Sequence, residues 1–248
     1  MYQPAMLLSP TGVPILSKAQ IDRIAEKYIV SFNPDILKLE QSFPAEEFCE
    51  SYLKLKVEYQ YLSHNGCYLG MAVFSDHTRI PLYESSSNSV RHVYFDANTI
   101  LLENALVDEM EEARLRFTQM HECAHQILHA NYFRRLGDKD TNSHTLCRRD
   151  EIEKNNAKPL SQWSDIDRME WQANYLASAF LMPADTVRSF CNMLQVQEYY
   201  DARTREGWSE QKAFDIAALD LTYVFGVSLV TAKIRLLNLG FKRKRIAV

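Results

Sequence analysis

Residues 116–129 read Arg-Phe-Thr-Gln-Met-His-Glu-Cys-Ala-His-Gln-Ile-Leu-His, and this stretch is the most informative part of the chain. On a helix, residues four apart lie on one face, so His121 and His125 can bind a single metal ion. Glu122 lies beside the first histidine and can take a proton from a water molecule held at the metal. The alternative is an amphipathic helix with two structural histidines. An apolar stripe at helical spacing predicts that the helix is buried: Phe117, Met120, Ala124, Ile127 and Leu128.

A second helix is predicted over residues 165–183, because its middle lacks glycine and proline, alanine and leucine are frequent, and Pro183 ends it. Glu170 offers the carboxylate of a His-His-Glu ligand set, which leaves one position of a catalytic zinc open for water. Asn174, one turn later, can accept a hydrogen bond from the free ring nitrogen of a metal-binding histidine. Glu170 can equally be an ordinary surface carboxylate, and spacing alone leaves other ligands open: His144, Glu151, Glu153, Asp165 and Asp167.

Two motifs in this order resemble those of the ImmA/IrrE metallopeptidases. The first is Arg-Phe-Thr-x-x-His-Glu-x-x-His-x-x-Leu-His, and the second, over residues 170–183, is Glu-x-x-Ala-Asn-x-x-Ala-x-x-x-Leu-Met-Pro. The resemblance extends over residues 21–241, and its N-terminal third depends on general pattern only. The chain departs from the family pattern at Cys123-Ala124, inside the first motif, and at Leu176, where the family often has phenylalanine. Neither departure involves a ligand.

The resemblance implies an α+β, zincin-like fold, in which a small twisted sheet packs against the metal-binding helices. It implies a Zn²⁺ ion bound by His121, His125 and Glu170, with Glu122 as the general base. A zincin-like metallopeptidase domain is expected over residues 1–200, followed by a helical, helix-turn-helix-like unit over 201–248. The implied substrate is a protein, typically a DNA-binding transcriptional repressor whose cleavage turns on a stress response or a mobile element.

The composition is that of an ordinary globular protein: 46% of the 248 residues are hydrophobic, 24% are charged, and the net charge is −4. This balance gives no basis for binding nucleic acid or an anionic membrane through the charge of the whole protein. No apolar run has the length of a transmembrane helix, and the N-terminal residues lack the basic region of a signal peptide. The five cysteines are scattered without a Cys-x-x-Cys pair, which is typical of reduced thiols in a cytoplasmic protein. Cys123 is expected to pack as a small apolar residue.

Hydrophobic periodicity predicts a first helix around residues 21–29 and, after a break at Asn33-Pro34, a short helix over 46–52. Near-perfect alternation over residues 53–62 predicts a half-buried strand. The polar stretch 134–164 connects the two metal-binding helices and is expected to line the cleft or to be partly mobile. Further strands are expected at residues 67–74, 78–83 and 91–96, with an exposed loop at 85–89.

The C-terminal part is predicted to form two helices. Ser209 and Ser228 are positioned to cap them, a turn at residues 225–227 separates them, and Gly240 ends the second. The pair resembles a helix-turn-helix unit, and a basic run at residues 242–245 could contact phosphate. A DNA-reading module presents a basic face, so we expect a recognition or packing role and no direct DNA binding. The charges of the two helices are nearly balanced, with Lys212, Lys233 and Arg235 against Glu210, Asp215 and Asp220.

We therefore expect a cytoplasmic, zinc-dependent endopeptidase in which Glu122 passes a proton from the attacking water to the leaving amine. His129, Tyr94 and Tyr175 are candidates for stabilising the oxyanion, and the sequence does not choose among them. One alternative is a metal hydrolase acting on a small molecule, against which an extended cleft beside an exposed edge strand would argue. The other is a regulatory or binding protein with a structural metal site, in which the C-terminal helices carry recognition. A structural zinc favours four protein ligands, whereas the sequence presents three.

Overall fold

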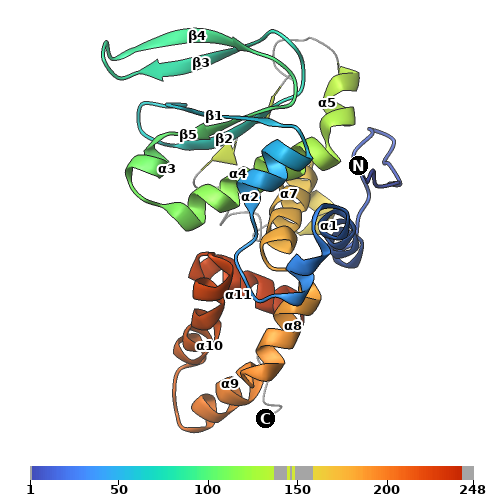
Figure 1. Cartoon of the computed structure of the whole chain (residues 1–248), viewed down its shortest axis with the longest axis vertical. Helices are drawn as coiled ribbons and strands as arrows, with labels where there is room; N and C mark the ends of the chain where they lie inside the picture. The colour runs from blue at the N-terminus through green and yellow to red at the C-terminus, as the bar shows by residue number, and fades with distance from the viewer. Residues whose placement is uncertain (1, 137–143, 146, 149–158, 242–248) are drawn as a thin grey trace.

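The computed structural model describes residues 2–136, 144–145, 147–148 and 159–241. It confirms an α+β fold, with two small sheets at one end of the molecule and most of the helices at the other (Figure 1). The helix that carries the His-Glu-x-x-His motif is α4 (Glu112–Leu128), which packs between the larger sheet and α7 (Asp165–Leu181). Helix α1 (Lys18–Phe32) packs against α7. This arrangement places the two motif-bearing helices face to face in the centre of the molecule.

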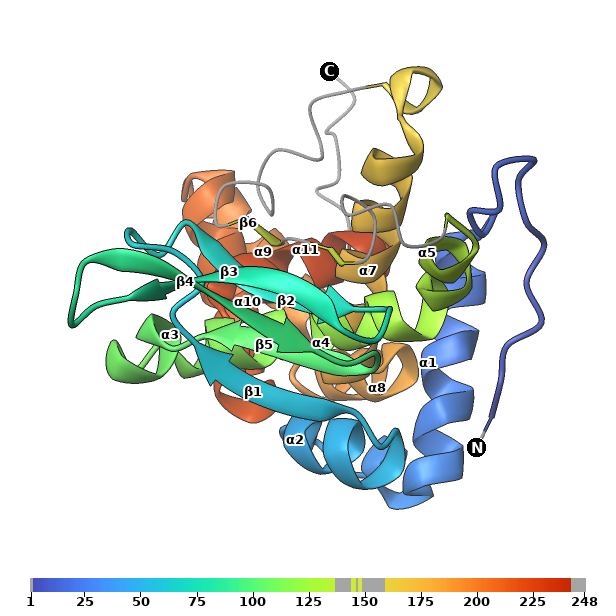
Figure 2. The same ribbon diagram turned by 90° about the horizontal axis from the view of Figure 1, so that it is seen from above.

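The larger sheet lies over α4, as the view from above shows (Figure 2), and has the strand order β1-β5-β2-β6. β1 and β5 are parallel, whereas β2 runs antiparallel to both β5 and β6. β3 and β4 form a separate antiparallel hairpin. The strands are β1 (Lys56–Gln60), β2 (Tyr68–Val73), β3 (Thr78–Glu84), β4 (Ser89–Phe95), β5 (Thr99–Glu103) and β6 (Cys147–Arg148).

The sequence predicts β2, β3 and β4 well, and it predicts β1 and β5 less well. The first strand begins only at Lys56, because Lys54 has a φ of 59° after the preceding helical turn and cannot belong to a strand. β5 is missing from the expectation. Its sequence Thr-Ile-Leu-Leu-Glu is buried at every position, so it lacks the alternation that marks a strand with one exposed face.

Side-chain caps mark where α1 and α7 begin. Ser17 and Gln20 form a capping box at the start of α1, and Ser164 and Asp167 form another at the start of α7. Pro183 follows the end of α7, as expected. The other helical segments are η1 (Pro34–Lys38), α2 (Ala45–Glu47), η2 (Phe48–Tyr52), α3 (Ala105–Asp108), α5 (Ala130–Leu136), η3 (Leu160–Gln162), α8 (Ala184–Met193), α9 (Val196–Arg205), α10 (Glu210–Phe225) and α11 (Leu229–Asn238).

An aromatic cluster holds α7 in position below α4. Phe180 of α7 lies 4.9 Å from Phe48 and 6.1 Å from Tyr28 of α1 between ring centroids, and Phe43 lies 5.2 Å from Phe48. All four rings are buried. Such pairs contribute about 0.5–1.5 kcal/mol each beyond the burial of their area. The cluster therefore restricts the rotation of α7, which carries Glu170.

The two C-terminal helices form as predicted. Ser209 and Ser228 accept backbone hydrogen bonds as the N-caps of α10 and α11, and Gly226 ends α10 with a φ of 63°. The two helix axes differ by 107°, which lies in the range of about 90–120° found in helix-turn-helix units. The basic run at residues 242–245 lies outside the described residues.

Arg235 anchors α11 to the rest of the protein. Its side chain is fully buried, its Nε donates a hydrogen bond to the carbonyl oxygen of Met182 at 2.9 Å, and its Nη2 lies 2.8 Å from Asp22 Oδ1. These contacts connect α11 to the end of α7 and to α1. The expected boundary at residue 200 lies inside α9, and the division of the chain into two domains stays a prediction.

No single helix in the described part of the chain is long and apolar enough to cross a membrane. Only α10 and α11 taken together, with the sharp bend between them, have the required length and composition.

Candidate metal centre

His121, His125 and Glu170 lie together between α4 and α7. The Nε2 atoms of the two histidines are 3.1 Å apart. The carboxylate of Glu170 lies 3.3 Å from His121 Nε2 and 3.4 Å from His125 Nε2. Both imidazoles are 1% exposed, and the side chain of Glu170 is 15% exposed. Three metal-ligating groups thus converge on one point that retains some access to solvent.

These separations fit a bound divalent metal ion. In a tetrahedral site with metal–ligand distances of about 2.0–2.1 Å, neighbouring ligand atoms lie about 3.3 Å apart. The observed separations of 3.1, 3.3 and 3.4 Å lie close to this value. Two imidazoles and one carboxylate also form the ligand set of many catalytic zinc sites. The described residues therefore fit a metal without rearrangement.

Asn174 orients the first histidine. Its Oδ1 lies 2.9 Å from His121 Nδ1, so the ring nitrogen donates to the amide oxygen and the lone pair of Nε2 points toward the metal site. Asn174 is one helical turn after Glu170 on α7, which explains how one helix supplies both a ligand and the partner of another ligand.

A chain of hydrogen bonds orients the second histidine. His125 Nδ1 lies 3.0 Å from His129 Nδ1, His129 Nε2 lies 3.0 Å from Gln172 Oε1, and Gln172 Nε2 donates to the carbonyl oxygen of Pro14 at 2.6 Å. The donor and acceptor roles in this chain are consistent if His125 donates to a neutral His129, which in turn donates to Gln172. Burial and the neighbouring His125 lower the pKa of His129 to about 3, so His129 is neutral. Because both ring nitrogens of His129 are engaged, it supports His125 and is not available to an oxyanion.

The charge of Glu170 matches a metal-binding role. Burial by itself would raise the pKa of its carboxyl group, but the two imidazoles against it outweigh this effect and lower the pKa below its usual range. Glu170 is therefore an anion throughout the neutral pH range. A cation bound by the two imidazole nitrogens would replace their protons and face the same anionic carboxylate.

Glu122 lies beside the metal centre and is fully buried. Its Oε2 accepts a hydrogen bond from the hydroxyl of Thr145 at 3.0 Å, and Thr145 is itself held by backbone contacts with Ala72 of β2. Its Oε1 has no hydrogen-bond partner among the described residues. Burial raises the pKa of Glu122 above its ordinary value, which strengthens the carboxylate as a base.

Gly70 allows β2 to approach α4 closely. A Cβ atom at this position would lie 2.7 Å from Thr118 Cγ2 and 2.9 Å from both Cγ and Oε1 of Glu122. Distances below 3.0 Å require neighbouring atoms to move. The glycine thus lets the sheet cover Glu122 directly.

We expect Gly70→Ala to lower the free energy of unfolding by about 1–3 kcal/mol, the usual cost of an overpacked core, and to displace Glu122. Denaturant unfolding measures the first effect. Thr118→Ser removes the methyl group that a Cβ at residue 70 would contact, so the double variant should recover part of the lost stability. An unchanged unfolding midpoint in Gly70→Ala would contradict the close approach.

Cys147 is a component of the site that the sequence does not reveal. It lies in β6, opposite Gly70, and is 3% exposed. Its Sγ, a ring nitrogen of His121 and a carboxylate oxygen of Glu122 lie within 4.8 Å of one another. Cys147 belongs to neither motif and has no nearby cysteine in the sequence, so the only signal was its position in the segment that connects the metal-binding helices.

The remaining candidates that the structure describes lie outside the two groups of ligand atoms. Among the described residues, the groups able to hold a metal include none of His144, Asp165 and Asp167. Glu151 and Glu153 lie outside the described residues. Tyr94 is 64% exposed on β4. The hydroxyl of Tyr175 donates to Asp22 at 3.0 Å.

Comparison with known proteins assigns the chain to a family. The family model described as the IrrE N-terminal-like domain, Peptidase M78, matches residues 82–237, which is more than half of the chain. The chain belongs to the M78 peptidase family. The M78 match begins in β3 and ends in α11, so it includes both metal-binding helices and the two C-terminal helices. None of the curated proteins compared with the chain matches it. Membership of the M78 family supports a metallopeptidase-type function.

Proposed function

We propose that the protein is a cytoplasmic, zinc-dependent endopeptidase that hydrolyses a peptide bond in a protein substrate. The observation that carries the proposal is the convergence of His121, His125 and Glu170 next to the buried carboxylate of Glu122. Three ligands leave one coordination position for a reactant, and a carboxylate beside that position is what hydrolysis requires. The M78 match supports the peptidase part of the proposal.

The roles of the residues follow from their contacts. A bound zinc ion would polarise the scissile carbonyl group and make the attacking water more acidic. Glu122 takes a proton from this water through Oε1, while the hydroxyl of Thr145 holds Oε2. As the C–N bond breaks, Glu122 returns the proton to the leaving amine, so that a carboxylic acid and an amine are formed from one peptide and one water. Asn174 and His129 keep the two histidines oriented.

A DNA-binding repressor is the substrate class that we propose, on the resemblance to ImmA/IrrE metallopeptidases. We propose that the C-terminal helices have a recognition or packing role and do not bind DNA directly. Their basic side chains are engaged within the protein, which supports this view. Lys233 pairs with Asp215, Arg235 is buried, and Lys212 lies 4.4 Å from the centre of the Trp208 ring.

One observation favours a second candidate, a regulatory protein with a structural metal site. Cys147 Sγ lies within 4.8 Å of a ring nitrogen of His121, which makes it a candidate for a fourth ligand. Four protein ligands would close the shell and leave no position for a reactant. The two candidates therefore differ in whether sulfur is bound to the metal.

We expect Cys147→Ser to retain about one metal ion per chain, because three ligands are sufficient for a catalytic site. Metal content after dialysis and the absorption spectrum of the Co²⁺-substituted protein test this expectation. Cys123→Ser is a matched control, since Cys123 is equally buried and lies on the same helix as the histidines but belongs to neither candidate ligand group.

A thiolate-to-cobalt absorption band in the wild type, lost in Cys147→Ser together with the metal, would favour the structural site. Retention of the metal, without such a band in the wild type, would favour the peptidase. The peptidase itself is tested by incubating the zinc-loaded protein with peptides derived from a proteome and identifying new termini by mass spectrometry.

A further inference from the structure

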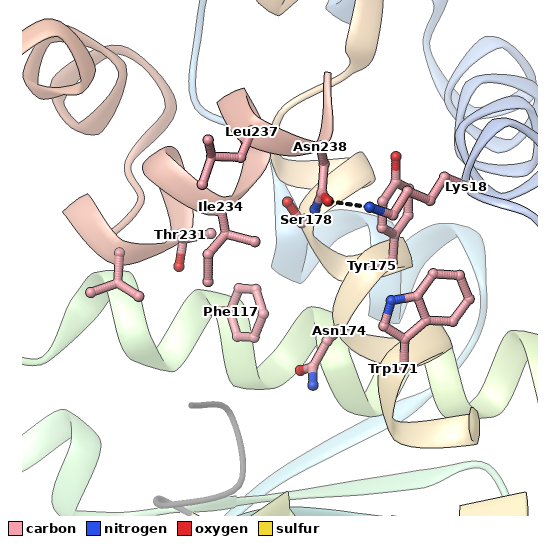
Figure 3. A pocket seen from close by; sticks show the side chains of 11 residues that line it. Lys18, Phe117, Trp171, Asn174, Tyr175, Ser178, Thr231, Ile234, Leu237 and Asn238 are labelled. Carbon is pink, nitrogen blue, oxygen red and sulfur yellow. Dashed lines mark hydrogen bonds between the residues drawn. The ribbon is translucent and has the colours of Figure 1, made fainter. Parts of the chain in front are cut away.

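A cavity of about 240 Å³ lies between α7 and α11 (Figure 3). We propose that this cavity, the α7–α11 pocket, binds an apolar side chain of the peptide substrate, so that α11 helps to select the bond that is cleaved. The proposal rests on the proposed peptidase function. Most of the pocket wall is apolar and comes from three helices: Phe117 of α4, Trp171 and Tyr175 of α7, and Val230, Ile234 and Leu237 of α11.

The α7–α11 pocket adjoins the metal centre at Asn174. This residue lines the pocket, and its Oδ1 accepts the hydrogen bond from His121 at 2.9 Å. Phe117 lies one helical turn before His121 on α4, and Trp171 directly follows Glu170 on α7. Figure 3 shows Asn174 and Phe117 side by side at the edge of the pocket. A peptide with its scissile bond at the metal therefore has a neighbouring side chain within reach of the pocket.

The size and chemistry of the pocket suit an aliphatic or aromatic side chain. A cavity of about 150 Å³ lined by leucine, isoleucine and phenylalanine takes up benzene, so a pocket of about 240 Å³ has room for leucine or phenylalanine. No carboxylate lines it among the described residues, and its one charged residue, Lys18, donates to Asn238 Oδ1 at 2.6 Å. A lysine or arginine side chain would lose hydration there without gaining a counter-charge.

The outer wall of the pocket is apolar surface held in place by the fold. Val230 and Leu237 are 50% and 44% exposed. They lie on α11, which the buried Arg235 anchors to α1 and to the end of α7. Exposed apolar side chains around a concave site, next to groups able to do chemistry, are typical of ligand-binding sites.

The first test compares Ile234→Trp, which fills the pocket, with Ile216→Trp, a matched change on α10 that lies outside it. Neither isoleucine is fully buried. The zinc-loaded wild type and both variants are incubated with the proteome-derived peptides, and the cleavage positions are compared. The unfolding midpoint and the zinc content of each variant show whether it is folded and loaded.

The wild type and Ile216→Trp are expected to prefer leucine, isoleucine, methionine or phenylalanine at one fixed position beside the scissile bond. Ile234→Trp should cleave such peptides roughly tenfold or more slowly and retain cleavage where that position is alanine or glycine. Leu237→Glu, at an exposed position, adds a carboxylate and should shift the preference toward lysine and arginine. An unchanged preference in folded, zinc-loaded forms of both pocket variants overturns the proposal.

A binding experiment separates failure of the pocket from failure of the peptidase function. N-acetyl-phenylalanine amide is titrated into the wild type, and the indole signal of Trp171, assigned with Trp171→Phe, is followed by NMR. A saturable shift that is absent with N-acetyl-lysine amide and absent in Ile234→Trp supports the pocket even where no peptide is cleaved. No shift in the folded protein overturns the proposal. A shift that depends only on protein concentration would assign the pocket to a second copy of the chain and would also overturn it.

Discussion

Glu122→Gln is expected to keep the fold and the metal content of the wild type and to lose peptide cleavage by roughly 10²–10⁴-fold, the contribution of general acid–base catalysis. The amide retains the shape of the side chain and its hydrogen bond from Thr145, but it cannot take a proton from water. The rate of cleavage of a peptide identified in the library, measured at saturating zinc, tests the prediction.

Glu112→Gln is the matched control, because Glu112 lies on the same helix but is exposed in its first turn. It should cleave at the wild-type rate. Cleavage by Glu122→Gln above about a tenth of the wild-type rate would contradict the role of Glu122 as the base. Loss of zinc from Glu122→Gln would instead point to a structural contribution of this residue to the metal centre.

Glu170→Ala is expected to lose most of its bound metal. The change removes one of three converging ligands and the single anionic charge among them, so the two histidines alone hold the ion weakly. Metal content per chain after dialysis against a mild chelator measures the effect. The wild type should also gain thermal stability from added zinc, because a ligand that binds the folded state stabilises it. Glu170→Ala should gain no thermal stability from added zinc.

Asp165→Ala and His144→Ala serve as controls for the metal measurement, since both residues were rival ligands and lie outside the candidate ligand groups. Both variants should retain the metal. Full occupancy in Glu170→Ala, combined with loss in either control, would show that the ligand set is different.

The spacing of the motifs predicts the main parts of the site because each part depends on local helix geometry. A separation of four residues brings His121 and His125 together, and the same separation relates Glu170 to Asn174. The structure adds that the two helices face each other. That pairing is a property of the tertiary fold, and only the second motif indicated it in the sequence.

The contributions of Thr145 and Cys147 are not predictable from the sequence in the same way. Both lie beside β2 and reach Glu122 or His121 through the pairing of a short segment with that strand. No periodicity marks this segment, because its position depends on contacts with residues that are distant in the sequence. The role of His129 was open for a related reason: its partner Gln172 comes from another helix.

The edge of the larger sheet also differs from the simplest expectation for a peptidase. An exposed edge strand beside the metal would allow an extended substrate to add to the sheet. In the described chain, β2 is paired with β6 at Tyr68 and Gly70, and Ala72 is bonded to Thr145. The α7–α11 pocket, on the opposite side of α4 from this strand pairing, therefore becomes the more informative place to look for substrate contacts.

The buried Arg235 has a consequence for the energetics of the whole chain. Removing Arg235 is expected to cost less than the value of about 3–5 kcal/mol for a fully buried ion pair, because the side chain of Asp22 is 19% exposed and also accepts a hydrogen bond from Tyr175. Arg235 is fully buried, and its partners Asp22 and Met182 belong to the N-terminal and central parts of the chain. We therefore expect α11 to unfold together with α1 and α7, which these contacts connect to it. A protein truncated near residue 200 would lose the guanidinium group of Arg235, which contacts Asp22 and Met182. We therefore expect truncation at this boundary to lower the stability of the remaining chain, even if the boundary separates two functions.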